Sequence, residues 1–165
     1  MGKHKEKEIK TNAMRILDNL DIEYDHVDYG LDHEFVSAAD LAEENGDDLA
    51  IIYKTLACKS KEGDIYIFVI DSASEIDFKK AAKAVGVKSL SMLELKKLKN
   101  TVGYERGATT SLAMKKDFPV IVDIRAKDKG YIKVSAGKIG HGLKLRADDL
   151  IKATKGKYED VVRCE

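Results

Sequence analysis

Two strongly apolar runs joined by a short polar turn constrain the fold of this chain most. The first is "IIYKTLAC" at 51–58 and the second is "IYIFVI" at 65–70, with "KSKEGD" between them. Runs of this length, rich in β-branched and aromatic residues and separated by a turn that contains Gly63, predict two antiparallel strands. We therefore expect a hairpin at the centre of a sheet.

Lys54 lies in the middle of the first predicted strand. Lysine is rarely fully buried, because removing an ammonium from water is costly unless a partner offsets the loss. Alternation along a strand places Lys54 on the same face as Ile52, Leu56 and Cys58, which are apolar. The side chain either extends past these neighbours to water, or lines a pocket in which a substrate supplies the opposite charge. The strand alone leaves both alternatives open.

The remaining patterns predict helices and strands in mixed order. The predicted helices cover 6–20, 37–46, 77–86, 91–100 and 147–154, and the further strands cover 22–29, 118–124, 131–135 and 143–145. Ser37, Asp77 and Ser91 are the expected N-cap residues. Because strands and helices do not alternate regularly, the order favours an α+β fold with a mixed sheet over a doubly wound fold.

Length and charge restrict the class of protein. The chain has 165 residues, so we expect one domain over 1–165, and its 29 basic and 29 acidic residues give zero net charge. A general binder of polyanions is excluded, and any contact with nucleic acid must be local. The longest apolar run is too short to span a membrane and no signal-peptide core is present, so we expect a cytoplasmic protein.

A run of lysines between residues 79 and 99 could form such a local basic patch. Its members are Lys79, Lys80, Lys83, Lys88, Lys96, Lys97 and Lys99. The alternative is an ordinary solvated helix face, and the sequence leaves both interpretations open.

Residues with reactive side chains are few and scattered. Cys58 and Cys164 form no C-x-x-C pair, and the histidines have no metal-ligand spacing, so we expect neither a metal nor another cofactor. His26, His33 and His141 have no evident partner, and no serine or cysteine lies in a nucleophile motif. We expect Cys58 to be a small core residue.

Two glycine-rich segments could approach a ligand closely. In "GYERGATTS" (103–111), Thr109, Thr110 and Ser111 supply hydroxyl groups beside two glycines. "SAGKIGHG" (135–142) follows a predicted strand but is not a Walker A loop, because Ile139 stands where Ser or Thr is needed. Such a turn can still present backbone N–H groups to an anion. Plain loops and binding loops both remain open.

Taken together, three segments resemble the YbaK/ProRS-associated family of aminoacyl-tRNA editing domains. They are "IIYKTL", "GYERGATTSLAMKKDFPVIVD" and "IKVSAGKIGHGLKLRADDL". The resemblance covers residues 9 to 163, and the motifs occur in the order found in the family. The branch of freestanding Cys-tRNA(Pro) deacylases is the most similar. The family implies a mixed, mainly antiparallel, partly barrel-like sheet surrounded by helices.

The resemblance also implies roles for individual residues. Lys54 falls on the characteristic active-site lysine of the family. The positions matched to substrate binding are Tyr29, Gly107, Ala108, Thr109, Thr110, Ser135, Gly137 and Lys138. Three features depart from the family pattern: Ala108 replaces a second glycine, "TSLA" (110–113) replaces S-P-x-G, and Gly142 replaces an acidic residue.

The implied activity is hydrolysis, in trans, of mischarged aminoacyl-tRNA(Pro), with Cys-tRNA(Pro) ahead of Ala-tRNA(Pro). Aminoacylated tRNA(Pro) is the expected partner, and prolyl-tRNA synthetase is an open second partner. The protein would orient an already activated ester and stabilise charge on its carbonyl oxygen, with backbone N–H groups at Gly107, Ala108 and Gly137 as expected donors. A non-catalytic adaptor that binds tRNA or the synthetase and a hydrolase of small esters or nucleotides are the alternatives. The oligomeric state is open.

Overall fold

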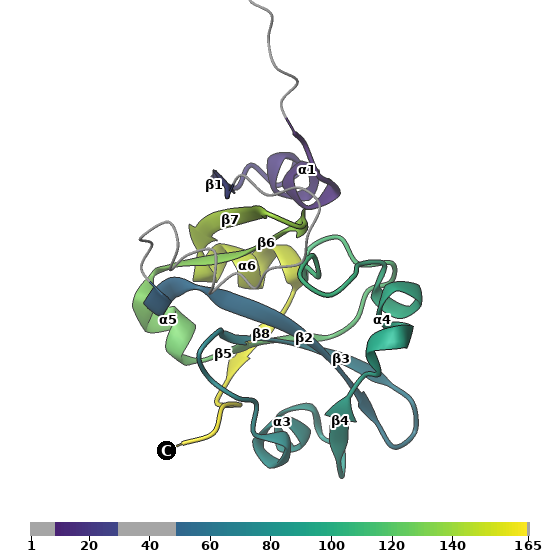
Figure 1. The fold of residues 1–165 in the computed structure, drawn as a ribbon. Coiled ribbons are helices and arrows are strands. Elements are labelled where there is room, and N and C mark those ends of the chain that lie inside the picture. The colour runs from purple at the N-terminus through teal and green to yellow at the C-terminus, as the bar shows by residue number, and fades with distance from the viewer. Residues whose placement is uncertain (1–8, 30–48, 165) are drawn as a thin grey trace, which may run out of the picture.

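The computed structural model describes residues 9–29 and 49–164 of the chain. Its strands form a three-stranded sheet in the order β1-β7-β6 and a five-stranded sheet in the order β4-β2-β3-β5-β8 (Figure 1). The strands are β1 (Asp25–Asp28), β2 (Tyr53–Ser60), β3 (Ile65–Asp71), β4 (Leu90–Met92), β5 (Val120–Asp123), β6 (Tyr131–Lys138), β7 (His141–Arg146) and β8 (Lys157–Glu159). The helices are α1 (Asn12–Asn19), the short 3-10 helix η1 (Leu49–Ile51), α3 (Phe78–Val85), α4 (Leu95–Val102), α5 (Arg125–Lys129) and α6 (Ala147–Thr154).

The predicted hairpin is confirmed as the centre of the larger sheet. Strands β2 and β3 pair antiparallel, with Lys54 opposite Ile70, and β5 then continues the sheet parallel to β3. The α+β class with a mixed sheet is therefore confirmed. The two sheets do not close into a barrel.

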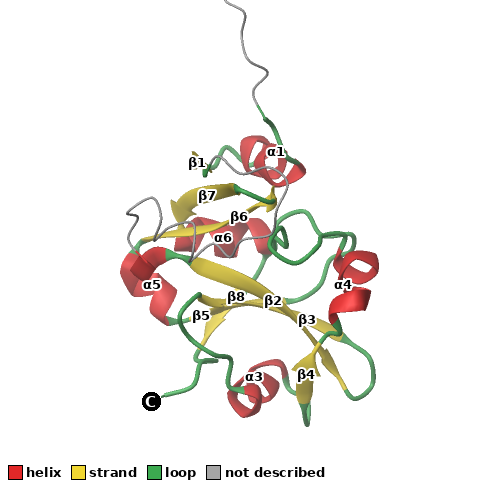
Figure 2. Cartoon of the chain, in the orientation of Figure 1, coloured by secondary structure: helices red, strands yellow, loops and turns green. Residues whose placement is uncertain are grey.

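Both faces of β2 are covered by other elements. Tyr53 and Ala57 belong to a core that also contains residues of α1, α6, β6 and β7. Cys58 belongs to a second core, formed with α3 and the C-terminal segment, and Leu56 packs against this core. In Figure 2, α3 lies on one side of the five-stranded sheet, and α6 with the three-stranded sheet lies on the other. Lys54 shares the face of Leu56 and Cys58, as the alternation predicts.

One isolated bridge connects the two sheets. Ile52, just before β2, pairs in parallel with Lys133 of β6. Because parallel partners project to the same side, this bridge aligns the Lys54 face of β2 with one face of β6. The bridge therefore determines which residues can meet Lys54.

Two predicted elements were wrong. Residues 91–100 do not form one helix, because Ser91 pairs with Lys59 in β4 and α4 begins only after Glu94. Residues 136–142 are not all a turn, because β6 continues to Lys138 and only two residues separate it from β7. In both places, backbone pairing with a neighbouring strand outweighs the local sequence preference.

The ends of two elements also differ from prediction. The first helix begins at Asn12, with Thr11 as its N-cap, and Leu20 lies beyond its end and is 41% exposed. The predicted strand at 22–29 is restricted to β1. The predicted helix at 37–46, with its cap Ser37, lies outside the described residues. No helix in the described ranges is long and apolar enough to cross a membrane.

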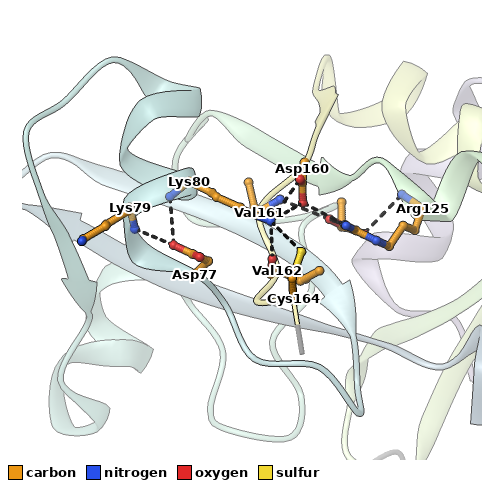
Figure 3. Close-up of polar contacts among 9 residues, drawn as sticks. Asp77, Lys79, Lys80, Arg125, Asp160, Val161, Val162 and Cys164 are labelled. Carbon is orange, nitrogen blue, oxygen red and sulfur yellow. Dashed lines mark hydrogen bonds and ion pairs between the residues drawn. The ribbon is translucent and has the colours of Figure 1, made fainter.

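The predicted cap Asp77 is confirmed, because its side chain accepts hydrogen bonds from the first turn of α3. A second carboxylate fixes the C-terminal segment beside this helix. Asp160 lies between the Lys80 ammonium, at 3.0 Å, and the Arg125 guanidinium, at 2.9 Å (Figure 3). Lys80 also donates to the Val162 carbonyl. These contacts connect α3, the start of α5 and the C-terminal segment.

Candidate active site

Lys54 and Ser135 lie on the same face of their two strands. The parallel bridge pairs Ile52 with Lys133, and each of the two site residues follows its bridge residue by two positions. Side chains two positions apart on a strand project to the same face. Both Lys54 and Ser135 are half-buried. Two predicted site residues far apart in the sequence are thus brought to one side of the molecule.

The Lys54 ammonium is held in a partly desolvated position. Burial lowers the pKa of Lys54 below its usual value, and the carboxylates of Glu75 and Asp71 only partly oppose this shift. Within the described residues, Lys54 forms no hydrogen bond or ion pair. An ammonium in such a position can stabilise negative charge on a bound group, because partial burial weakens the screening by water.

A bulge at the end of β6 brings Ser135 and Gly137 together. The Gly137 N–H donates a hydrogen bond to Ser135 Oγ at 3.0 Å, and the β6–β7 register shifts after Ser135. Gly137 has φ +91°, and a Cβ there would lie 3.2 Å from Tyr104 Cε1 and 3.5 Å from Thr110 Cγ2. Glycine is therefore needed both for the backbone angle and for the close approach of the 103–115 segment.

The 103–115 segment forms a closed loop that packs against this bulge. Its ends meet where the Lys115 N–H donates to the Val102 carbonyl. Inside the loop, the Tyr104 hydroxyl donates to the Ala113 carbonyl at 2.8 Å. The hydroxyl of Thr109 donates to a backbone carbonyl, and that of Thr110 accepts from a backbone N–H. Both threonine hydroxyls thus hold the loop in shape.

Two of the expected backbone donors are already engaged. The Ala108 N–H donates to the Glu105 carbonyl, and the Gly137 N–H donates to Ser135 Oγ. An oxyanion site built from these N–H groups therefore requires the two bonds to be exchanged for bonds to the substrate. Because Ser135 Oγ accepts this bond, its own O–H is directed elsewhere and can donate to a substrate. Lys54 and the Ser135 hydroxyl are therefore further candidate donors.

Tyr29 borders the same face, directly after the end of β1. Its ring lies against Gly142, where a Cβ would be 3.4 Å from Tyr29 Cε2 and 3.7 Å from its hydroxyl oxygen. Gly142 is the direct partner of Ser135 in the β6–β7 ladder, so Tyr29 also lies beside Ser135. Glycine at position 142, in place of the acidic residue of the family pattern, thus leaves the space that the tyrosine ring occupies.

The other predicted site residues surround this group less closely. Ala108 and Thr110 are buried. Thr110 has no exposed surface and packs against Gly137. Gly107 is exposed, with φ +89°, and Lys138 is exposed at the end of β6. No group of three or more His, Cys, Asp or Glu side chains suited to a metal ion occurs in the described part of the chain.

A histidine pair was missed by the sequence. His26 Nε2 and His141 Nδ1 lie 2.9 Å apart and the rings stack, so the expectation that these residues have no partner was wrong. The two histidines meet because β1 pairs with β7, and no local sequence pattern predicts that pairing. His33 lies outside the described residues. Cys58 is confirmed as a core residue with no exposed surface, and burial raises the pKa of its thiol to about 12.

The fold and this group of residues define an α+β domain with a desolvated lysine beside a hydroxyl-bearing bulge. The family model of the aminoacyl-tRNA editing domain matches residues 33–153. A protein of Enterococcus faecalis with the provisional name Cys-tRNA(Pro)/Cys-tRNA(Cys) deacylase EbsC is 34% identical over 165 residues, which cover 100% of both chains. The chain therefore belongs to the aminoacyl-tRNA editing domain family. The family and the enzyme class predicted from the motifs are confirmed at this level.

Two solved structures share the fold. One is provisionally described as a trans-editing enzyme for prolyl-tRNA synthetase; it has a TM-score of 0.76 and 16% identity, and the match covers 95% of this chain and 100% of that one. The other, of a hypothetical protein, has a TM-score of 0.80 and 17% identity, and the match covers 90% of this chain and 97% of that one. At such low identities, these matches concern the fold alone.

Proposed function

We propose that the protein hydrolyses mischarged aminoacyl-tRNA(Pro) in trans, with Cys-tRNA(Pro) as its preferred substrate and Ala-tRNA(Pro) as a poorer one. The observation that carries the proposal is the Lys54 ammonium, which is half-buried on the face of Ser135 and has no described partner. The full-length similarity to a relative named as a Cys-tRNA deacylase supports the choice of amino acid.

In this proposal the protein supplies position and charge. An aminoacyl ester is already activated, so catalysis needs mainly orientation of the ester and stabilisation of the carbonyl oxygen as it becomes negative. Lys54 and the Ser135 hydroxyl act on that oxygen. The bulge and the 103–115 loop hold Ser135 in place through Gly137.

Two attacking groups fit this site. Water adds to the carbonyl carbon, the ester C–O bond breaks, and the ribose oxygen takes up a proton. For a cysteinyl ester, the thiol of the substrate can add instead, which forms a C–S bond and releases a small cyclic thioester with the same loss of the ribose oxygen. The second route gives preference for cysteine without any nucleophile from the protein.

A deacylation panel tests the proposal. Cys-, Ala-, Ser- and Pro-tRNA(Pro) are incubated with the wild type and with Lys54→Met. We expect Cys-tRNA(Pro) to be hydrolysed fastest and Pro-tRNA(Pro) to be spared, because its ring misplaces the ester. Equal hydrolysis of the Cys and Pro esters would overturn the specificity. Binding of tRNA without hydrolysis of any ester would favour a non-catalytic adaptor instead.

A further inference from the structure

An exposed aromatic ring lies beside two cations on the three-stranded sheet. Tyr131 of β6 is directly opposite Arg146 of β7. The centroid of the Tyr131 ring lies 5.0 Å from the Arg146 guanidinium carbon and 5.7 Å from the Lys144 ammonium. The tyrosine is 45% exposed. These three residues are called the Tyr131 cluster below.

The positive charge of the Tyr131 cluster is not neutralised within the described residues. Neither Lys144 nor Arg146 forms an ion pair or a hydrogen bond there, although Asp25 is opposite Lys144 in the ladder and Asp149 lines the same groove. The lysines of α4 differ, because Lys96, Lys97 and Lys99 each lie within ion-pair distance of a glutamate. The Tyr131 cluster is thus a better candidate than the lysines of α4 for binding an external anion.

The Tyr131 cluster lies on the same face as the candidate active site. Ser135–Gly142, Lys133–Lys144 and Tyr131–Arg146 are alternate pairs of the β6–β7 ladder, and alternate pairs share a face. Tyr131 is four positions from Ser135 along the strand, a distance of roughly 13 Å. A long ligand with its ester at Ser135 can therefore reach the cluster.

A groove beside the Tyr131 cluster has two walls of opposite net charge. Its volume is about 960 Å³, and Lys144, Arg146 and Lys152 lie with one carboxylate, Asp149, on the side formed by β7 and α6. The side formed by α1, the start of β1 and the chain between them carries the carboxylates Asp18, Asp21, Glu23 and Asp25, and its one ammonium, Lys10, is paired with Asp18. Such a groove repels phosphates from one wall and attracts them to the other, where the aromatic ring is located.

We propose that the Tyr131 cluster binds the single-stranded 3′ end of the RNA whose ester is held at Lys54 and Ser135. One base stacks on Tyr131, and the phosphates contact Lys144 and Arg146. This inference rests on the proposed function and adds the surface that holds the rest of the substrate. Aromatic rings with adjacent cations suit single-stranded nucleic acid, because every base has a face that stacks and every linkage has a charge. An acidic protein partner would need the cations but not the ring.

The test measures the affinity for a labelled, unacylated RNA with a single-stranded 3′ overhang. Tyr131→Leu should lower the affinity about 5-fold or more, whereas Tyr131→Phe, which keeps the ring, should retain it. The double variant Lys144→Gln/Arg146→Gln should weaken binding. It should also reduce the slope of log affinity against log salt concentration by about 0.7 for each phosphate that is no longer neutralised. Lys127→Gln is the matched control, because Lys127 also lies over a tyrosine ring, 5.8 Å from the centroid of Tyr158, but on another element.

The outcomes distinguish RNA binding at the Tyr131 cluster from ester hydrolysis at Lys54 and Ser135. Unfolding midpoints close to that of the wild type establish that each variant is folded. If Tyr131→Leu binds RNA as the wild type does, the inference is overturned; an effect of the cations alone would then indicate phosphate contacts without stacking of a base on the ring. If the wild type hydrolyses no ester but its RNA affinity depends on Tyr131, the proposed function is wrong and the inference about the Tyr131 cluster is supported. If both hold, Tyr131→Leu raises the KM for aminoacyl-tRNA more than that for aminoacyl-adenosine.

Discussion

The ring of Tyr29 lies against Gly142, with Tyr29 Cε2 only 3.4 Å from the place where a Cβ would be. The Val134 carbonyl oxygen lies 3.3 Å from the same point. A side chain at this position must therefore displace the tyrosine or move the strand. The ring and the glycine together form one border of the candidate active site.

The first prediction concerns this pair. Gly142→Asp should lower the free energy of unfolding by roughly 1–3 kcal/mol, because the added atoms have no space beside Tyr29 and Val134. It should also change the relative rates on Cys- and Ala-tRNA(Pro), because Tyr29 borders Ser135. Chemical denaturation and the deacylation panel measure the two effects.

A double-mutant cycle with Tyr29→Ala provides the control. Removing the ring first should reduce the stability cost of Gly142→Asp, because one of the two obstructing groups is gone. Equal costs in the two backgrounds would show that Tyr29 does not respond to the side chain at position 142.

The second prediction concerns the bulge. Gly137→Ala should cost about 1–2 kcal/mol for its positive φ, plus about 1 kcal/mol or more for the close approach to Tyr104. Gly63→Ala is the matched control, because Gly63 has φ +96° with nothing within 4 Å of its Cβ position. Urea denaturation of both variants should show the larger loss of stability at Gly137. Equal losses would mean that the loop adjusts without strain.

The sequence predicted the central hairpin because its apolar alternation is strong and its turn residues are clear. Asp77 was also predictable, because an N-cap depends on residues close in the chain. Ser91 was misassigned because its pairing with Lys59 is a contact between distant residues, which local preference does not report.

The candidate site was predictable in its residues but not in its geometry. The motifs identified Lys54 and Ser135, while the bridge from Ile52 to Lys133 that aligns their faces has no local signature. The bond that engages the Gly137 N–H was not predictable for a similar reason: its partner, Ser135 Oγ, is determined by the bulge.

The third prediction concerns the two thiols. Cys58 has no exposed surface and burial raises its pKa to about 12, whereas Cys164 is exposed. A thiol reagent at pH 8 should therefore label one thiol per folded chain and two in denaturant. Cys164→Ser should abolish the labelling of the folded protein. Rapid labelling of that variant would contradict the burial of Cys58.

The fourth prediction concerns Lys54 as the source of positive charge. Lys54→Met should reduce deacylation of Cys-tRNA(Pro) by about 100-fold, as the loss of one preorganised electrostatic group typically does. Its free energy of unfolding near neutral pH should be unchanged or higher, because the charged form of Lys54 is penalised by burial. If Lys54 only extended to water, turnover would persist and stability would fall because the packing of its aliphatic stem would be removed.

The pH dependence of the same variant separates these alternatives further. The folded-state pKa of Lys54 lies below the free value of 10.5, so between these two pH values the unfolded chain binds more protons than the folded one. The wild type therefore gains stability relative to Lys54→Met as the pH rises through this window, and the advantage of the variant should shrink. Over the same window, the rate of the wild type, divided by that of uncatalysed hydrolysis, should fall as the ammonium loses its proton. Denaturation curves and initial rates measured from pH 7 to pH 10.5 on both proteins provide the test, and a rate ratio that stays constant across it would remove Lys54 from the reaction.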